Sequence, residues 1–427
     1  MAVQFRFATI DDAEELAEVH TRSWQTAYRG LIDQAFLDAI DPRDRAEVYR
    51  AALSAPEPTP RVWVVAEEVD DSGAPIRLLG HTESHVDAAD ETRGILQILY
   101  LEPETFGTGL GKQLHDMSLR GLHRFGVRTA ALSVLQGNQR AIAFYERQGW
   151  HSTGEIDDED WSGVTVPAVQ MEIELSVDLL AANEEYWTGQ APWYAERQTW
   201  SPEVDWGVHG VLDADAGGIF PEVAGLDVVE IGCGTAYVSN WARLGGARNV
   251  IALDYTPAQL ATAQERARTH QVDLPLVRAD GHRLPFADDS FDLAINEYGA
   301  AIWCDPRIWI PEAARVLRPG GRIWFLGNSV AFMLCAPEFE GQVAQPAFVR
   351  PQRGMHRMEW IDTPNVEFHV SHGEMISILT GAGFVIEALH ELYAPEEAEA
   401  SAYGFSDGAW ASQWPVEEVW VARLPEQ

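Results

Sequence analysis

The sequence is poor in basic residues, with 30 Lys and Arg against 66 Asp and Glu and a formal net charge of −36. A protein that follows a nucleic-acid backbone needs clustered cations to displace condensed counterions. Neither half of this chain supplies such a cluster. The charge balance argues against a nucleic-acid partner and, for the same reason, against binding to an anionic membrane surface.

Cysteine and long hydrophobic runs are also scarce. The three cysteines, Cys233, Cys304 and Cys335, lie far apart without metal-ligand spacing, so we expect no bound metal. A sparse, odd set of thiols is typical of a reducing cytosol. No stretch reaches the ~18 apolar residues that cross a bilayer, and residues 1–16 lack the basic-then-apolar order of a signal peptide. We therefore expect a cytoplasmic protein with no membrane partner; the composition indicates no particular oligomeric state.

The 427 residues are too many for one ordinary core, while 46% hydrophobic and 22% charged residues are typical of a globular chain. Two α/β patterns follow one another without an internal repeat. The pattern changes at about residues 176–182, where no Pro- or Gly-rich linker occurs. We predict two domains, residues 1–176 and residues 177–427.

The first pattern predicts a mixed, mostly antiparallel sheet with flanking helices. A helix begins near Asp11, where acids crowd the first turn and favour the positive end of the helix dipole. The acidic segment 155–160 is expected to be a loop. Further helices are predicted over 109–125 and 138–148, and strands over 3–9, 62–67, 78–85, 94–101, 129–134 and 168–175.

The second pattern opens with an aromatic-rich segment, residues 177–220, which we expect to be helical. Strands and helices then alternate over residues 226–325. Such alternation predicts right-handed crossovers and a Rossmann-like, doubly wound, mostly parallel sheet. The whole chain is therefore expected to be a two-domain α/β protein.

A nucleotide-binding motif lies within this alternation, in the segment DVVEIGCGTA at residues 227–236. An apolar strand ends in glycines, which let the backbone approach a ligand, and the next helix presents unpaired N–H groups at its start. A second strand, residues 249–254, ends in Asp254, 24 residues after Glu230. An acid at this place can accept hydrogen bonds from ribose hydroxyls.

These residues resemble the class I methyltransferases that depend on S-adenosylmethionine (SAM), over roughly residues 180–425. Asp254 matches the ribose-binding acid and Asp280 the acid that contacts the adenine amino group. The segment 291–296 resembles the fourth strand, whose end faces the methyl group, and 317–322 the turn into the fifth strand. The resemblance implies SAM as cofactor, held by Glu230, Gly232, Cys233, Gly234, Asp254, Asp280, Gly281 and Asn296.

A dinucleotide site is the competing interpretation, because nicotinamide enzymes share the glycine loop and the acid. That site normally carries a third glycine. Here Thr, Ala and Tyr follow Gly234, and the next glycine is Gly245. The motif order therefore favours methyl transfer.

Methyl transfer requires little acid–base catalysis by the protein, because the sulfonium donor is already activated. His356 and His369 are candidates for a general base, since imidazole titrates near neutral pH. Tyr298 and Trp303 are candidates for an aromatic wall that binds a flat or cationic acceptor. Each of these four side chains has a simpler interpretation as a packing or rim residue.

In the first half, a strand at residues 98–101 opens through the segment ETFGTGLG into a helix. Three glycines let several amides converge beside a helix N-terminus, which suits a pyrophosphate. The motif is not a Walker loop, because no Gly-Lys-Ser/Thr follows. A tight turn without a ligand remains the alternative.

Together with the segment NQRAIAFYERQGW at residues 138–150, this loop resembles the GNAT superfamily of N-acetyltransferases over residues 1–176. The resemblance implies that Asn138 contacts the arm of acetyl-CoA and that Tyr145 protonates the departing thiolate, since a phenol donates at neutral pH. Trp24 and Tyr28 lie in a segment that resembles the helix on the acceptor side. The pyrophosphate would bind the amides of Gly107, Thr108, Gly109, Leu110 and Gly111.

Two positions depart from the GNAT pattern. Phe106 replaces the Gln or Arg that is usual in the loop. Gln97 stands on the strand where many members carry a glutamate base, and the acidic and imidazole groups nearby in sequence are Glu83, His85 and Glu91. The base is then another side chain, a water chain, or absent.

Our first hypothesis is a bifunctional enzyme that methylates and N-acetylates small-molecule acceptors. The second keeps the methyltransferase and makes the GNAT-like domain a non-catalytic CoA-binding or regulatory module. The third makes the chain an acceptor-binding protein with vestigial cofactor sites.

Overall fold

The computed structural model describes residues 2–54, 59–161, 164–198, 200–401 and 403–426. The chain forms two compact units: Met1–Val177 with Ile361–Thr363, and Asp178–Trp360 with Pro364–Gln427. Among the described residues, every helix is too short or too polar to cross a lipid bilayer.

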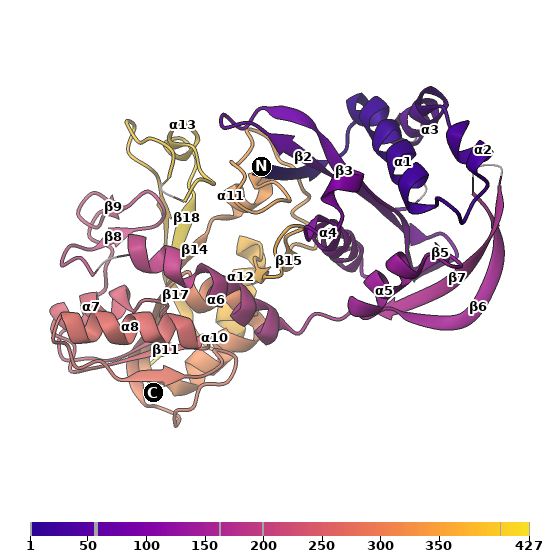
Figure 1. Ribbon diagram of the computed structural model, residues 1–427. Helices are drawn as coiled ribbons and strands as arrows, with labels where there is room; N and C mark the ends of the chain where they lie inside the picture. Colours follow the sequence, from indigo (N-terminus) through magenta and orange to yellow (C-terminus); the bar gives the residue numbers. More distant parts are fainter. Residues whose placement is uncertain (1, 55–58, 162–163, 199, 402, 427) are drawn as a thin grey trace. The chain divides into compact units, whose positions relative to one another are not determined.

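The first unit contains one seven-stranded sheet in the order β1-β2-β3-β4-β5-β7-β6 (Figure 1). Neighbouring strands are antiparallel except β4 and β5, so the predicted mixed, mostly antiparallel sheet is confirmed. Its elements are β1 (Ala2–Phe7), η1 (Ile10–Asp12), α1 (Ala13–Ala27), α2 (Gln34–Asp38), α3 (Pro42–Ser54), β2 (Arg61–Val69), β3 (Pro75–Asp87), β4 (Asp90–Leu101), η2 (Pro103–Thr105), α4 (Leu110–Arg124), β5 (Thr129–Leu135), α5 (Gln139–Arg147), β6 (His151–Asp160) and β7 (Thr165–Glu174).

Helices cover both faces of this sheet, as successive residues of β2 show. Val62 lies against α4, where a Cβ added to Gly121 would come within 2.5 Å of its Cγ2. The next residue, Trp63, packs into the cluster formed by α1 and α3. Alternate side chains of a strand point to opposite faces, so the core is divided into two layers.

Two parts of the first unit differ from the sequence prediction. The helices α2 and α3 lie in residues 34–54, where we predicted no element. The acidic segment 155–160 belongs to strand β6, which pairs with β7 at the edge of the sheet. This strand has almost no buried residue, so it lacks the alternation that identifies strands, and its charges are typical of an exposed edge.

The second unit contains another seven-stranded sheet, in the order β12-β11-β10-β13-β14-β18-β17. The four pairs from β12 to β14 are parallel, and β18 is antiparallel to both neighbours. The remaining strand pairs are β8–β9 and β15–β16. The elements are α6 (Leu179–Arg197), β8 (Asp205–Trp206), β9 (Val211–Leu212), β10 (Asp227–Ile231), α7 (Tyr237–Leu244), β11 (Asn249–Asp254), α8 (Pro257–Thr269), β12 (Leu276–Arg278), β13 (Phe291–Glu297), α9 (Gly299–Trp303), α10 (Pro306–Val316), β14 (Leu317–Asn328), α11 (Val330–Cys335), β15 (Arg357–Glu359), β16 (Val366–Phe368), α12 (His372–Gly381), β17 (Val385–Leu392), α13 (Gly408–Ala411) and β18 (Glu417–Arg423).

Each face of this sheet has its own hydrophobic core. On β10, Val228 joins the cluster that contains Trp241 of α7, and Val229 joins the cluster that contains Trp309 of α10. Val228, Val229 and Trp309 are fully buried. A doubly wound sheet of this kind places ligands at the carboxyl ends of its central strands.

The predicted helix over residues 177–220 is wrong beyond Arg197, where α6 ends. The chain then continues through the short strands β8 and β9. Trp206 of β8 is fully buried and packs on Trp324 and Trp241, with ring centroids 4.7 and 5.5 Å away. The aromatic side chains after Arg197 pack in the core, and a non-helical backbone can place them there as well as a helix can.

Candidate active sites

The glycine loop of the second unit follows β10 directly. Gly232, Gly234 and Ala236 all have positive φ, at 79°, 51° and 62°. The amides of Gly232 and Cys233 both donate to the carbonyl of Leu253, at 2.8 Å each. A Cβ at Gly232 would lie 2.7 Å from Cα of Gly299. Only glycine fits this position, because the backbone of the next segment passes directly beside it.

Asp254 lies at the end of β11 and faces the loop. Its Oδ2 accepts a hydrogen bond from the amide of Gly234, and its Oδ1 accepts one from the amide of Thr256, each at 2.8 Å. Burial raises the pKa of Asp254, and these hydrogen bonds oppose the shift. Each oxygen keeps acceptor capacity for a hydroxyl donor, as a ribose site requires.

A cavity of about 240 Å³ opens beside this loop. It brings together eight of the residues selected from the sequence, which come from loops far apart along the chain. The eight lining residues are Gly232, Cys233, Gly234, Asp254, Asp280, Gly281, Tyr298 and Trp303.

Glu230 and Asn296 do not line this cavity. Glu230 accepts hydrogen bonds from the amide and the hydroxyl of Ser239, so it joins β10 to α7. Burial raises the pKa of Glu230 to about 8. Asn296 accepts a hydrogen bond from the amide of Ala301 at 3.3 Å. Both side chains therefore position backbone segments around the cavity.

The two candidate bases, His356 and His369, also lie outside the cavity. His356 Nε2 is 3.0 Å from a carboxylate oxygen of Asp305. His369 Nε2 is 2.8 Å from an oxygen of Glu367, and the residue lines a separate cavity of about 30 Å³. The geometry gives neither imidazole access to the cavity beside the glycine loop.

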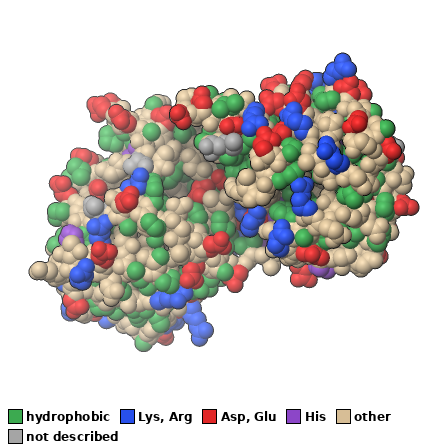
Figure 2. All heavy atoms as spheres, viewed as in Figure 1, with side chains coloured by type: hydrophobic (Ala, Val, Ile, Leu, Met, Phe, Trp, Pro, Cys, Tyr) green, Lys and Arg blue, Asp and Glu red, His purple; other side chains and the backbone are tan. Residues whose placement is uncertain are grey.

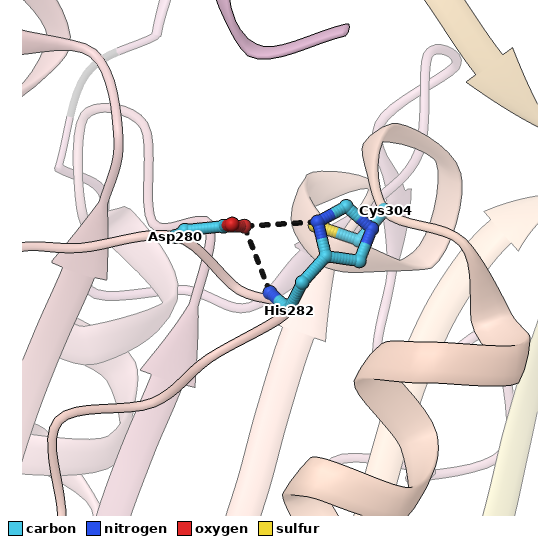
Figure 3. A group of neighbouring side chains, drawn as sticks. All are labelled: Asp280, His282 and Cys304. Carbon is cyan, nitrogen blue, oxygen red and sulfur yellow. Dashed lines mark hydrogen bonds and ion pairs between the residues drawn. The ribbon is translucent and has the colours of Figure 1, made fainter.

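Asp280 belongs to a cluster with His282 and Cys304 whose potential ligand atoms lie within 4.8 Å of one another (Figure 3). His282 donates to Asp280 through its backbone amide and through Nδ1, both at 2.9 Å, and its Nε2 accepts from the amide of Asp305 at 2.8 Å. Both ring nitrogens are thus engaged. Burial raises the pKa of Cys304 well above its usual value, so the thiol stays protonated. The cluster therefore fixes the orientation of the Asp280 carboxylate.

Helix α6 contributes side chains that we did not assign from the sequence. Tyr186, Trp187 and Tyr194 all line the cavity, and the Tyr186 ring stacks on Trp303 with centroids 5.8 Å apart. Residues seven and eight apart lie on one face of a helix. The spacing within residues 186–194 was therefore a usable signal for a shared surface.

The glycine loop of the first unit joins β4, through η2, to α4. Gly107 and Gly109 have φ of 82° and 96°, and no atom lies within 4 Å of a Cβ built on either. Gly109 is the N-cap residue of α4, which has no side-chain cap. The open backbone beside a helix N-terminus fits an anionic pyrophosphate.

A cavity of about 830 Å³ adjoins this loop. Thr108 and Leu110, whose amides we expected to hold the pyrophosphate, do not line it: the amide and the hydroxyl of Thr108 both donate to the carbonyl of Thr105, and Leu110 is buried. The residues selected from the sequence that do line it are Trp24, Tyr28, Gly107, Gly109, Gly111, Asn138 and Tyr145.

Asn138 and Tyr145 lie on either end of α5. The side-chain oxygen Oδ1 of Asn138 accepts a hydrogen bond from the backbone amide of Ala141 at 3.2 Å and caps the helix. The side-chain NH₂ group of Asn138 is then the group that can donate to a ligand. Burial raises the pKa of Tyr145 well above its usual value, with a further contribution from Tyr100. The phenol therefore stays protonated at neutral pH and can act as a proton donor.

The structure compensates for Phe106 in the loop. The guanidinium of Arg140 lies 3.9 Å from the centre of the Phe106 ring, and both residues line the cavity. This cation–π contact holds a positive charge beside the glycine amides. The pair supplies the cationic contact that Phe106 itself lacks.

Two acidic side chains of this cavity come from β6. Gln97 lines the cavity, but Glu83, His85 and Glu91 do not. Glu159 and Asp160 do line it. Burial alone would raise the pKa of Glu159. Its carboxylate accepts hydrogen bonds from the side chains of Ser133, Trp161 and Gln170, and together these lower its pKa below the usual value. Sequence reasoning missed these acids because segment 155–160 was expected to be a loop.

Comparisons with known proteins match one family model to a segment of each unit. Residues 16–150 match the model of the acetyltransferase (GNAT) family, and residues 229–325 match a methyltransferase domain model. A malonyl-[acyl-carrier protein] O-methyltransferase of Pectobacterium atrosepticum is 40% identical over 109 residues, which are 25% of this chain and 40% of that protein. The chain thus spans less than half the length of this curated relative.

Two solved structures resemble the separate units. A SAM-dependent methyltransferase of Mesorhizobium loti is 24% identical, with a TM-score of 0.42, and covers 51% of this chain and 100% of its own. The PaiA N-acetyltransferase of Thermoplasma acidophilum, solved with coenzyme A, is 23% identical, with a TM-score of 0.32, and covers 41% of this chain and 100% of its own. By the two family models, the chain carries a domain of the acetyltransferase (GNAT) family at residues 16–150, followed by a methyltransferase domain at residues 229–325.

Proposed function

We propose that the protein is a bifunctional, cytoplasmic transferase that methylates one small-molecule acceptor group with SAM and N-acetylates an amine with acetyl-CoA. The observation that carries the proposal is the presence of two cavities, each beside a left-handed glycine loop where a strand opens into a helix. We place the functional domains at residues 1–176 and 177–427.

In the methyltransferase domain, bound SAM supplies an activated methyl group. Asp254 would accept hydrogen bonds from the ribose hydroxyls, and Asp280, held by His282, would accept one from the adenine amino group. The backbone at Gly234, where the nearest atom to an added Cβ is 4.0 Å away, leaves room for the methionine part. The surrounding apolar side chains exclude water from the nucleophile.

In the acetyltransferase domain, bound acetyl-CoA supplies an activated acyl group. The open amides of Gly107 and Gly109, with the Arg140 charge beside them, fit the pyrophosphate. The protonated Tyr145 donates to the departing sulfur. The ionised carboxylate of Glu159 is placed in the same cavity, where it can hold the acceptor amine and take its proton.

A non-catalytic CoA-binding module is the second candidate for the first domain. Gln97 favours it, since a glutamine on β4 cannot accept the proton of an amine. Glu159 favours the acetyltransferase over the non-catalytic module, because only acetyl transfer needs a group in the cavity that accepts the proton of the amine.

The test uses the full chain, purified and incubated separately with labelled acetyl-CoA and labelled SAM, each with panels of amines. Transfer of both labels supports the bifunctional enzyme. Methyl transfer with CoA binding but no acetyl transfer, unchanged in Tyr145→Phe, supports the binding module. Failure of both labels to transfer, together with no calorimetric binding of either cofactor, would refute the proposal.

A further inference from the structure

The cavity beside the glycine loop of the methyltransferase domain is lined by six acids. Its described lining residues contain no Lys, Arg or His, and the bases that pair with two of the acids, Arg278 and His369, lie outside the lining. Such a lining stabilises positive charge and disfavours carboxylates and phosphates. The acids that line it are Glu184, Asp254, Asp280, Glu297, Glu340 and Glu367.

Five of these six acids are already engaged. Asp254 and Asp280 belong to the proposed SAM site. The other three are bonded to neighbouring side chains: Glu184 to Arg278, Glu340 to Tyr186, and Glu367 to Trp360 and His369.

Glu297, the last residue of β13, is different. It is only 8% exposed, and its Oε1 accepts a hydrogen bond from the amide of Gly207 at 2.8 Å. Its Oε2 is buried and makes no hydrogen bond of ordinary geometry with a described residue, while the hydroxyl of Tyr237 approaches the carboxylate and lowers its pKa. A carboxylate can accept several hydrogen bonds. Glu297 therefore keeps acceptor capacity beside the cavity that it lines.

An aromatic wall lines the same cavity. Besides Tyr186 stacked on Trp303, the ring of Trp187 lies 5.0 Å from that of Tyr194, which lies 5.7 Å from that of Tyr403. The faces of such rings attract cations, most strongly where water is excluded. The Glu297 carboxylate and several aromatic rings therefore line the same cavity.

We propose that the methyl acceptor is a cationic amine whose ammonium group donates a hydrogen bond to Oε2 of Glu297 while its hydrocarbon part packs on the aromatic wall. This inference rests on the proposed methyltransferase function and narrows its acceptor to a nitrogen nucleophile. An anionic acceptor would meet no counter-charge from the described lining.

Glu297 also takes part in the chemistry. The ammonium proton passes to Oε2, and the N–H bonding pair stays on nitrogen as a lone pair. That lone pair forms the N–CH₃ bond while the S–CH₃ bond breaks and its electrons remain on sulfur, so the sulfonium becomes a neutral thioether. Burial raises the pKa of Glu297 to about 8, opposed by the Gly207 amide and supported by Glu417. A base with a pKa near the working pH suits this exchange.

The test compares three probes of similar size and different charge: 2-phenylethylamine, 2-phenylethanol and 3-phenylpropionate. Calorimetry with the full chain and S-adenosylhomocysteine gives the dissociation constants, and labelled SAM gives the methyl-transfer rates. We expect the amine to bind at least ~10-fold more tightly than the alcohol or the carboxylate, because it alone forms a charge-assisted hydrogen bond. We expect methyl transfer to the amine alone.

Glu297→Gln tests the assigned group, because glutamine keeps the acceptor for the Gly207 amide and loses the charge. We expect amine binding about 10- to 100-fold weaker, SAM affinity changed by less than about two-fold, and loss of the rise in kcat/KM with pH. Glu387→Gln is the matched control, since its carboxylate pairs with Arg322 and Arg423 at the surface. The titratable groups that face Glu297 are Asp205, Tyr237, Tyr298, Tyr403 and Glu417.

Three results would overturn the inference: amine binding no tighter than alcohol binding, no effect of Glu297→Gln on the amine, or an equal loss of SAM affinity in that variant. The last result would assign Glu297 to the ammonium group of SAM itself. No binding of SAM to the unsubstituted protein would refute the proposed function instead.

Discussion

Replacing Gly232 with alanine tests the glycine loop most directly. The new Cβ would lie 2.7 Å from Cα of Gly299 and 2.8 Å from the amide nitrogen of Ala300, and both are backbone atoms. At φ of 79° a side chain also costs about 1–2 kcal/mol. Overpacking adds about 1–3 kcal/mol. We expect the free energy of unfolding of this domain to fall by about 2–5 kcal/mol in total.

Gly234→Ala is the matched control. Its φ of 51° is also left-handed, but the nearest atom to an added Cβ is Gln259 Oε1 at 4.0 Å. Ala236 shows that this loop tolerates alanine at φ of 62°. We expect a loss of at most about 1 kcal/mol, partly offset because alanine restricts the unfolded chain.

Thermal unfolding followed by calorimetry measures both variants. For a domain of this size, 1 kcal/mol shifts Tm by about 2–4 °C, so Gly232→Ala should melt roughly 5–15 °C lower and bind SAM at least ~10-fold more weakly. A Gly232→Ala protein that melts within 2 °C of the unsubstituted chain (about the shift expected for 1 kcal/mol or less) and keeps its SAM affinity would show that the loop does not depend on this close approach.

Three further predictions concern single carboxyl and phenol groups. Asp254→Ala should weaken SAM binding by about 1–3 kcal/mol in calorimetry, through loss of charged hydrogen bonds; unchanged affinity would favour a vestigial site. Tyr145→Phe should lower kcat for acetyl transfer about 10²-fold or more with CoA affinity retained, and an unchanged kcat would remove its role as acid. Burial raises the pKa of Glu230 and Glu297 to about 8 and of Glu417 to about 7. The folded domain therefore holds protons that the unfolded chain releases above about pH 4.5, so its Tm should fall between pH 5 and pH 8. A Tm that rises over this range would contradict that assignment.

The fold was predictable wherever the chain shows a strong hydrophobic period. The strand at residues 227–231 and its glycines indicated the parallel sheet, and residues 98–111 indicated the other loop. Strand β6 was not predictable, because an exposed edge strand buries almost nothing and leaves no period in the sequence. The helix prediction was wrong after Arg197 for the opposite reason. This segment has buried aromatic side chains that suggested a packed helix, but its backbone is mostly irregular.

The site was predictable for residues whose roles depend on the backbone, such as Gly232 and Asp254. It was less predictable for side chains whose orientation depends on tertiary packing. His356 and His369 are close in sequence to cavity residues, yet their imidazoles pair with acids elsewhere. Glu159 lines its cavity only because β6 pairs with β7.

On the face drawn in Figure 2, basic side chains are interspersed among acidic ones in both units. The 36 surplus negative charges of the chain cannot be neutralised in ion pairs, so they repel one another, and added salt should weaken that repulsion.

Tyr298 has φ of 58° and ψ of −74°, a conformation that costs about 1–3 kcal/mol in a residue with a side chain. Its hydroxyl donates to Glu417 at 2.6 Å, which helps to keep the backbone in place. Glycine at this position would remove the backbone cost, but it would also remove a ring that packs on two hydrophobic clusters and leave the buried Glu417 without this donor. The strained turn is therefore held by its own side chain, which also fixes the direction of the adjoining Glu297.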